Sequence, residues 1–210
     1  MDSLKRAAAH LPRVDAIGGS AAGCYSHNRV TWASLFRGVG PELFDEKVRG
    51  MFLKIAEEWG VPLDVINDGE VTALAGSMAM GKNGVLGIAM GTSQGGGYID
   101  MEGNITTWLS ELAFAPVDLH PKAPADEWSG DLGCGAQYFS QQAVGRLLPA
   151  SGIEYDKTLK LPEQLKIVQS LMEQGDQRAL KIYDAIGIYL GYSLAHYAEF
   201  YDYEYLLPTA

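Results

Sequence analysis

The sequence has few cysteines and no long uninterrupted hydrophobic run. Its two cysteines, Cys24 and Cys134, form no C-x-x-C pair, and without a secretory context they argue against a disulfide framework. The longest apolar region, residues 83–99, is interrupted by six glycines and falls short of the roughly 20 apolar residues of a membrane-spanning helix. We therefore expect no membrane span, no export signal and a cytoplasmic location.

Basic residues are scarce relative to acidic ones. The chain has 16 Lys and Arg against 26 Asp and Glu, which gives a formal net charge of −10. Because nucleic acid is held by clustered Lys and Arg, this balance argues against a nucleic-acid partner. Disorder is excluded on other grounds, since hydrophobic residues make up 47% of the chain and charged residues 20%, enough apolar material for a core.

Glycine, in contrast, is abundant. There are 25 glycines among 210 residues, about 12% compared with about 7% in average proteins. This excess predicts many tight turns or close backbone approaches. The length suggests one large or two small domains.

Strand and helix signals alternate along the first part of the chain. Apolar runs at residues 14–18 and 63–66 end in turn residues and predict buried strands. Helical spacing predicts helices over residues 41–59 and 70–80, the first of them stopped by Gly60. This alternation favours the parallel α/β class.

The later part is predicted to contain a hairpin, a loop and further helices. An apolar strand at 85–90 is followed by a glycine-rich loop at 91–97 and a strand at 98–101. Prolines and glycines make residues 113–135 a loop or lid. Helices are expected over three stretches: 137–148, 162–174 and 176–201.

Polar residues follow the second predicted strand. Asn67, Asp68 and Gly69 would lie at its carboxyl end, where open α/β sheets bind ligands. There Asp68 could accept a proton from a hydroxyl group, and Asn67 could hydrogen-bond a polyol. The same residue types also form ordinary turns, and the spacing alone favours the turn.

Residues 91–97 carry four glycines in seven positions. A backbone without Cβ atoms can direct N–H groups toward phosphate oxygens, and the hydroxyls of Thr92 and Ser93 add donors. The loop is not a Walker A motif and does not match G-x-G-x-x-G. A glycine-rich hairpin without a ligand is the alternative, although hairpins normally need one or two glycines.

Together these two segments resemble the ROK family of sugar kinases and repressors, which has the ribonuclease H-like fold of actin, hsp70 and the sugar kinases. Residues 66–76 resemble its Asn-Asp-Ala-Asn catalytic segment, and residues 91–97 resemble its second phosphate loop. Residues 17–23 are similar to its Gly-x-x-x-Pro-Gly turn, without the proline. Residues 109–112 resemble its Gly-Glu-x-Gly-His segment, and residues 133–140 its Gly-Cys-x-Glu segment.

The resemblance implies a two-lobed, ATP-dependent sugar kinase with lobes at residues 1–82 and 83–210. Asp68 would be the general base that takes the proton from the attacking sugar hydroxyl. Asn67 and Glu111 would hold sugar hydroxyls. Magnesium would accompany ATP. The residues implied at the nucleotide phosphates are Gly91, Thr92, Ser93, Gly95 and Gly96.

Some positions depart from the family pattern. The family's zinc site uses a His where this chain has Phe114, together with several cysteines where this chain has only Cys134. One thiolate cannot build a closed tetrahedral site, so we predict no zinc. The family's Glu after Gly-Cys-x is Ala136 here, and the neighbouring Gln137 is the candidate to replace that sugar contact.

The ends of the resemblance suggest an incomplete N-terminal lobe. Nothing before Val14 matches the family's opening Asp-x-Gly-Gly-Thr segment, so the chain is expected to correspond to the middle of a longer family member. The predicted strands at 14–18 and 63–66 would then lack sheet neighbours, and a homo-oligomer or a strand-supplying partner chain is expected. Two alternatives to the kinase remain open, a sugar-binding sensor without catalysis and an inactive fragment with an interaction role.

Overall fold

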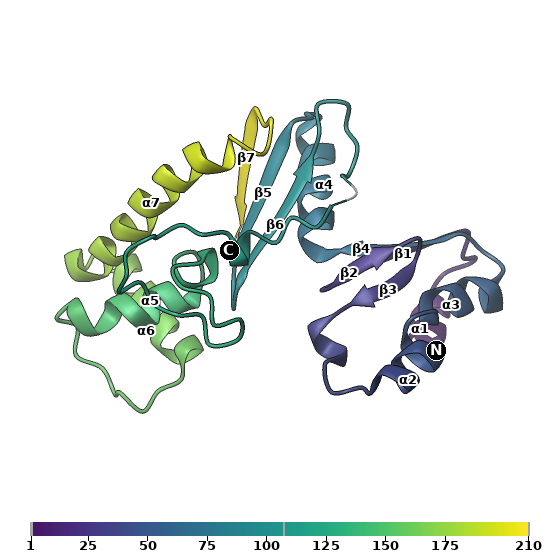
Figure 1. Ribbon diagram of the computed structural model, residues 1–210, viewed down its shortest axis with the longest axis horizontal. Helices are drawn as coiled ribbons and strands as arrows, with labels where there is room; N and C mark the ends of the chain where they lie inside the picture. The colour runs from purple at the N-terminus through teal and green to yellow at the C-terminus, as the bar shows by residue number, and fades with distance from the viewer. Residues whose placement is uncertain (1, 107, 210) are drawn as a thin grey trace. The chain divides into compact units, whose positions relative to one another are not determined.

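The computed structural model describes residues 2–106 and 108–209, which fall into two compact units, Met1–Val71 and Thr72–Ala210 (Figure 1). Helix α4, Asp68–Met80, begins in the first unit and continues into the second. None of the helices in the described part of the chain is long and apolar enough to cross a membrane.

The first unit contains a parallel strand pair and a separate hairpin. Strand β1, Ile17–Ala21, pairs in parallel with β4, Leu63–Asn67. Strands β2, Cys24–Ser26, and β3, Arg29–Trp32, form the antiparallel hairpin. The sequence predicted β4 closely, but it placed the first strand at 14–18 and missed the hairpin. The first strand begins later because its pairing with β4 starts at Ile17. The N–H of Ile17 donates to the carbonyl of Pro62 at 2.9 Å.

The helical part of the first unit is segmented. The predicted helix over 41–59 is divided into α2, Pro41–Leu43, a π-helical turn η2, Phe44–Val48, and α3, Met51–Trp59. The predicted stop is confirmed, since Gly60 is left-handed with φ +63° and caps α3. Two more elements complete this unit, helix α1, Asp2–Ala8, and the 3-10 turn η1, Ser34–Phe36.

The side chain of Asn28 takes the place of a neighbouring strand along β4. Asn28 lies in the β2–β3 turn with φ +60°. Its Nδ2 donates to the carbonyl of Leu63 at 2.7 Å, and its Oδ1 accepts from the N–H of Val65 at 2.8 Å. One amide side chain therefore satisfies two backbone groups of β4, which fixes the hairpin against this strand.

Replacement of Asn28 by Ala is expected to lower the free energy of unfolding by about 1–3 kcal/mol, because both backbone groups of β4 lose their partner. Urea unfolding followed by circular dichroism would measure this change. The control is His27→Ala at the adjacent left-handed position, since the Nδ1 of His27 lies 3.1 Å from the Oγ of Ser26 within the hairpin itself. Equal unfolding midpoints for the two variants would contradict this account.

The second unit is built on a three-stranded sheet with the order β6-β5-β7. Strand β5, Val85–Met90, pairs antiparallel with β6, Gln94–Ile99, and parallel with β7, Tyr205–Thr209. Alternate side chains of β5 face opposite sides of the sheet. Val85 packs with Ala73 of α4, whereas Leu86 and Ile88 pack with residues of α7, Gln177–Tyr197. The sheet is therefore covered on both faces.

Helices α5, Gln141–Leu147, α6, Leu161–Glu173, and the first half of α7 share a second apolar core. Helix α5 starts later than the predicted residue 137 because the Oγ of Ser140 caps it by accepting from the N–H of Gln142 at 3.0 Å. Short 3-10 turns lie around these helices: η3, Leu112–Phe114, η4, Gly135–Gln137, and η5, Leu148–Ala150.

Candidate functional site

The predicted site residues are divided between the two units. Asn67 and Asp68 lie in the first unit, and the glycine-rich segment, Glu111 and Gln137 lie in the second. Each half has its own local geometry.

In the first unit, Asn67 and Asp68 form the turn between β4 and α4. Asn67 ends the strand and Asp68 begins the helix. The Oδ1 of Asn67 accepts from the N–H of Gly69 at 2.8 Å, and its Nδ2 donates to the carbonyl of Gly23 at 2.9 Å. Asp68 also accepts from the N–H of Gly69, at 3.2 Å. The Asn67 side chain thus fixes the start of the helix, as a capping residue does.

Tyr25 is a neighbour of Asp68 that sequence reasoning missed. Burial raises the pKa of Tyr25, and the nearby negative charge of Asp68 raises this pKa further. The Tyr25 hydroxyl donates to the carbonyl of Ala22 at 3.0 Å, and its ring contacts that of Phe52 with centroids 5.8 Å apart. Because Tyr25 belongs to the unpredicted hairpin, no local pattern indicated that it would lie near Asp68.

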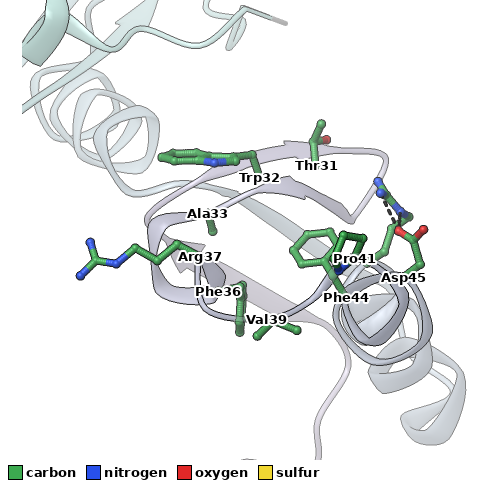
Figure 2. Close-up of a pocket in the computed structure, with 10 residues that line it drawn as sticks. Thr31, Trp32, Ala33, Phe36, Arg37, Val39, Pro41, Phe44 and Asp45 are labelled. Carbon is green, nitrogen blue, oxygen red and sulfur yellow. Dashed lines mark hydrogen bonds and ion pairs between the residues drawn. The ribbon is translucent and has the colours of Figure 1, made fainter. Parts of the chain in front are cut away.

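The first unit also contains a hollow of about 410 Å³, shown in Figure 2. Its lining includes the rings of Trp32, Phe36 and Phe44. At one end the Nε of Arg49 donates to the Oδ1 of Asp45 at 2.8 Å. No sequence pattern indicated this hollow.

In the second unit, the glycine-rich segment is mostly strand. Only Gly91, Thr92 and Ser93 form the turn between β5 and β6, and Thr92 and Ser93 are exposed at its tip. The predicted loop over 91–97 is wrong in extent, because the residues from Gln94 onward pair with β5. Two backbone hydrogen bonds of Gly91 hold the turn. Its N–H donates to the carbonyl of Ser93 across the turn, and the carbonyl of Gly91 accepts from the N–H of Gln141, both at 3.0 Å.

Close packing explains the glycine at position 96. A Cβ at Gly96 would lie 2.5 Å from the carbonyl oxygen of Ser110 and 2.7 Å from the Cγ of Leu112. At Gly95, in contrast, the nearest atom would be the Cβ of Ala89 at an ordinary 3.6 Å. The glycine excess in this strand therefore reflects, at least at Gly96, a backbone that passes close to its neighbour.

Close packing at Gly135 brings together the turns that carry the other predicted site residues of the second unit, Glu111 and Gln137. A Cβ at Gly135 would lie 2.0 Å from the Oε1 of Gln94 and 2.4 Å from the carbonyl oxygen of Leu112. The turn η4 therefore packs directly on the start of β6 and on η3. Glu111 immediately precedes η3 and Gln137 ends η4, so these two predicted sugar-binding residues lie on neighbouring turns.

A hydrogen-bonded cluster supports Gln137, which is itself buried. Its backbone carbonyl accepts from the Nη2 of Arg146 at 3.3 Å. The guanidinium of Arg146 lies 4.5 Å from the centroid of the Tyr138 ring, and the Tyr138 hydroxyl donates to the carboxylate of Asp118. No local sequence pattern indicated this cluster, because its members come from separate segments.

The hydrogen bond between Tyr138 and Asp118 shifts the pKa values of both groups. The Tyr138 hydroxyl, followed by the N–H of His120, holds the pKa of Asp118 below its usual range. Burial, followed by the hydrogen bond to Asp118, raises the pKa of Tyr138. A carboxylate with a lowered pKa in the folded state stabilises the fold above its unfolded pKa, about 3.9.

Asp118→Asn is therefore expected to lower the melting temperature at pH 7, with the deficit shrinking as the pH falls through the lowered pKa of Asp118. At that point the wild-type carboxylate is protonated as well and loses its advantage. Melting curves between pH 7 and pH 3 would measure this. Tyr138→Phe should show the same pH dependence, and the double variant should add little to either. A deficit that does not change with pH would contradict the assignment.

The described residues do not fit the zinc site of the family that this chain resembles. Burial raises the pKa of the Cys134 thiol, which disfavours a metal-binding thiolate. Phe114 stacks on Trp128 with ring centroids 5.5 Å apart. Within residues 2–106 and 108–209, no three His, Cys, Asp or Glu side chains are grouped so that they could hold a metal ion.

Comparison with known proteins gives one sequence relative of note. No family profile matches the chain. A glucokinase of Halalkalibacterium halodurans is 30% identical over 162 residues, which cover 70% of this chain and 48% of that protein. The chain thus spans about half the length of this curated relative.

Solved structures match nearly the whole chain. A ROK family transcriptional regulator described as a homologue of the E. coli MLC protein has a TM-score of 0.76 at 18% identity, with 99% of this chain and 52% of that chain covered. The ROK hexokinase of Thermus thermophilus has a TM-score of 0.70 at 20% identity, with 99% and 66% covered. A ROK glucokinase of Streptomyces griseus, in complex with glucose and AMPPNP, has a TM-score of 0.68 at 22% identity, with 99% and 70% covered.

Proposed function

We propose that this chain, which has the actin- and hsp70-like α/β fold of the ROK sugar kinases and regulators, transfers the γ-phosphoryl group of ATP to a sugar hydroxyl. The observation that carries the proposal is the position of Asp68. Its carboxylate lies at the carboxyl end of the parallel strand β4, at the first residue of α4, where α/β proteins place their ligands.

In the proposed reaction, Asp68 accepts the proton of a sugar hydroxyl as the hydroxyl oxygen attacks the γ-phosphorus. The new oxygen–phosphorus bond forms while the bond to the β-phosphate oxygen breaks, and ADP leaves. Asn67, whose side chain fixes the turn beside Asp68, keeps the base in place. Most of the rate acceleration in such reactions comes from positioning and charge stabilisation.

The second unit would supply the other contacts. The exposed turn of Gly91, Thr92 and Ser93 would hold the nucleotide phosphates through hydroxyl and N–H groups, with Gly95 and Gly96 shaping the strand behind it. Glu111 and Gln137 would hold sugar hydroxyls. Magnesium, when bound with ATP, would neutralise phosphate charge.

The substrate we propose to test first is a hexose. The sequence relative is named a glucokinase, and the Streptomyces griseus structure contains glucose with an ATP analogue. We place the reaction in the cytoplasm, where ATP is available.

A second candidate function is sugar sensing without phosphoryl transfer. It is favoured by the structural likeness to a ROK transcriptional regulator, and it requires only the sugar-binding residues. An inactive fragment with an interaction role would bind neither sugar nor nucleotide.

One experiment separates these functions. The purified chain is incubated with magnesium-ATP and a panel of hexoses and amino sugars, and both ADP release and sugar binding by calorimetry are measured. Sugar-dependent ADP release supports the kinase. Sugar binding without ADP release supports the sensor, and the absence of both overturns the two proposals.

We also infer that the outer edge of β1 pairs with another strand. In the described part of the chain, strands β1 and β4 form a two-stranded sheet, and small parallel sheets are seldom stable alone. The hairpin residue Asn28 already bonds to β4, so the edge of β1 is the open side. A second copy of the chain, or a partner chain, would supply the strand by β-augmentation.

A further inference from the structure

Residues 124–133 form a short hairpin within the long segment between η3 and η4. An antiparallel bridge between Ala125 and Leu132 joins its two arms. At the tip, a carboxylate oxygen of Asp126 accepts from the N–H of Trp128 at 3.1 Å, which fixes the turn. A two-stranded hairpin is at best marginally stable by itself, so the position of the 124–133 hairpin depends on the residues that it contacts.

The hairpin is attached at both its base and its tip. At the base, the carbonyl of Gly133 accepts from the N–H groups of Val117 and Asp118, at 2.9 and 3.0 Å. At the tip, the indole of Trp128 stacks on the ring of Phe114, with centroids 5.5 Å apart and planes inclined by 29°. This separation lies within the range that aromatic pairs favour. The side chain of Trp128 is still 49% exposed, so the stack lies at the surface of the unit.

The stack lies on the turn that carries Glu111. We call residues 111–114 the Glu111 turn. The N–H of Phe114 donates to the carbonyl of Glu111 at 3.2 Å, which closes this turn. In a 3-10 turn, side chains three residues apart lie on the same side. The ring of Phe114, with Trp128 stacked on it, therefore lies on the side from which the Glu111 side chain extends, and a movement of the hairpin tip would disturb the Glu111 turn.

The side chains around this turn suit an aromatic contact better than a metal ion. Phe114, at the position of a zinc ligand in the family that this chain resembles, has no side-chain nitrogen, oxygen or sulfur atom to offer. Cys134 is 1% exposed and packs in an apolar cluster with Ala113 and Ala136. A cysteine in such surroundings acts as a small hydrophobic residue. Apolar contacts thus occupy both positions from which zinc would be bound.

We propose that the Phe114–Trp128 stack, without a metal ion, clamps the 124–133 hairpin to the Glu111 turn. The consequence for sugar binding rests on the proposed function, in which Glu111 holds a sugar hydroxyl. The clamp would then set the affinity for hexose, because it fixes the turn that presents Glu111. Phe114 and Trp128 are positioning residues, since they act through Glu111.

Hydrogen exchange of the ligand-free chain tests the clamp. Phe114→Ala is expected to speed exchange of the amides of residues 126–131 about two- to tenfold, the effect of losing one aromatic pair. Leu119→Ala is the matched control, because it removes an 88% exposed apolar side chain from the same segment and should leave this exchange unchanged. The zinc chelator dipicolinate should also leave the wild-type exchange unchanged. Unchanged exchange in Phe114→Ala, or faster exchange after chelation, would overturn the proposal.

Calorimetry extends the test to the sugar. Trp128→Ala is expected to raise the dissociation constant for the tightest-binding hexose about two- to tenfold. The affinity for a non-hydrolysable ATP analogue should not change, whereas a general loss of structure would weaken both ligands. Trp128→Phe keeps a stacking ring and should stay within about twofold of the wild-type value.

The outcomes separate the clamp from the proposed function. A hexose affinity that is the same in Trp128→Ala as in the wild type would overturn the positioning role. A chain that binds no hexose, yet shows the faster exchange in Phe114→Ala, would support the clamp and overturn the proposed function instead.

Discussion

Asp68→Asn is expected to lower kcat for sugar phosphorylation by about 10²–10⁴-fold, the contribution of a positioned general base. An amide of the same shape cannot accept the proton of the sugar hydroxyl. Its side-chain oxygen can still accept from the N–H of Gly69, which Asp68 bonds at 3.2 Å, so the start of α4 should remain intact. The KM values for sugar and ATP should change much less than kcat, because the variant keeps the shape of the site.

The measurement is steady-state turnover with the most active sugar of the panel. The matched control is Asp64→Asn, which makes the same substitution in β4, where the carboxylate accepts from the Nδ2 of Asn28 at 3.1 Å. This control should keep wild-type turnover. A variant at position 68 that retained more than about one tenth of the wild-type kcat would rule out Asp68 as the general base.

The second large effect is expected at Gly133. This residue has φ +65°, and a Cβ there would lie 1.9 Å from the carbonyl oxygen of Asp118. The carbonyl of Gly133 accepts from the N–H groups of Val117 and Asp118, at 2.9 and 3.0 Å. Gly133→Ala would force these backbone segments apart. We expect it to lower the free energy of unfolding by more than about 4 kcal/mol, the range reached by severe core damage.

Gly130→Ala separates the steric effect from backbone strain. Gly130 lies in the same segment with φ +79°, but an added Cβ would meet nothing within 4 Å. This control should cost only about 1–2 kcal/mol, the penalty for a left-handed non-glycine residue. Denaturant unfolding and hydrogen exchange of residues 116–134 would compare the two variants. Similar losses for both would show that the close approach to Asp118 is not important.

Much of the architecture could be predicted from local pattern. The apolar run that became β5 and the helical periodicity that became α6 were predicted within a residue or two of their observed bounds. The capping role of Gly60 was also predicted correctly. These features depend on residues close together in the chain, so their signal is present in the sequence. The alternation of strand and helix signals predicted the α/β class, and the resemblance carried by the Asn-Asp and glycine-rich segments implied the fold that the solved structures confirm.

Other features were invisible because they depend on residues far apart in the chain. Asn28 supports β4 across 35 to 37 positions, and no periodicity marks such a contact. The sequence placed residues 94–97 in a loop, whereas pairing with β5 makes them a strand, because their hydrogen-bond partners outweigh the low strand preference of glycine. The sugar-binding and catalytic roles of Asn67, Asp68, Glu111 and Gln137 stay predictions, and so does the lobe boundary between residues 82 and 83. The same holds for the nucleotide-binding roles of Gly91, Thr92, Ser93, Gly95 and Gly96.

The sequence by itself determined the α/β class, most helices and the position of the Asp68 turn, because periodicity and capping act over a few residues. Only the tertiary structure decided which glycines are required, which polar groups support Gln137, and that Tyr25 lies near Asp68. These outcomes depend on the approach of separate segments, such as the packing of Gly135 against Gln94 and Leu112. Such approaches are set by the packing of the whole unit, which no short stretch of sequence encodes.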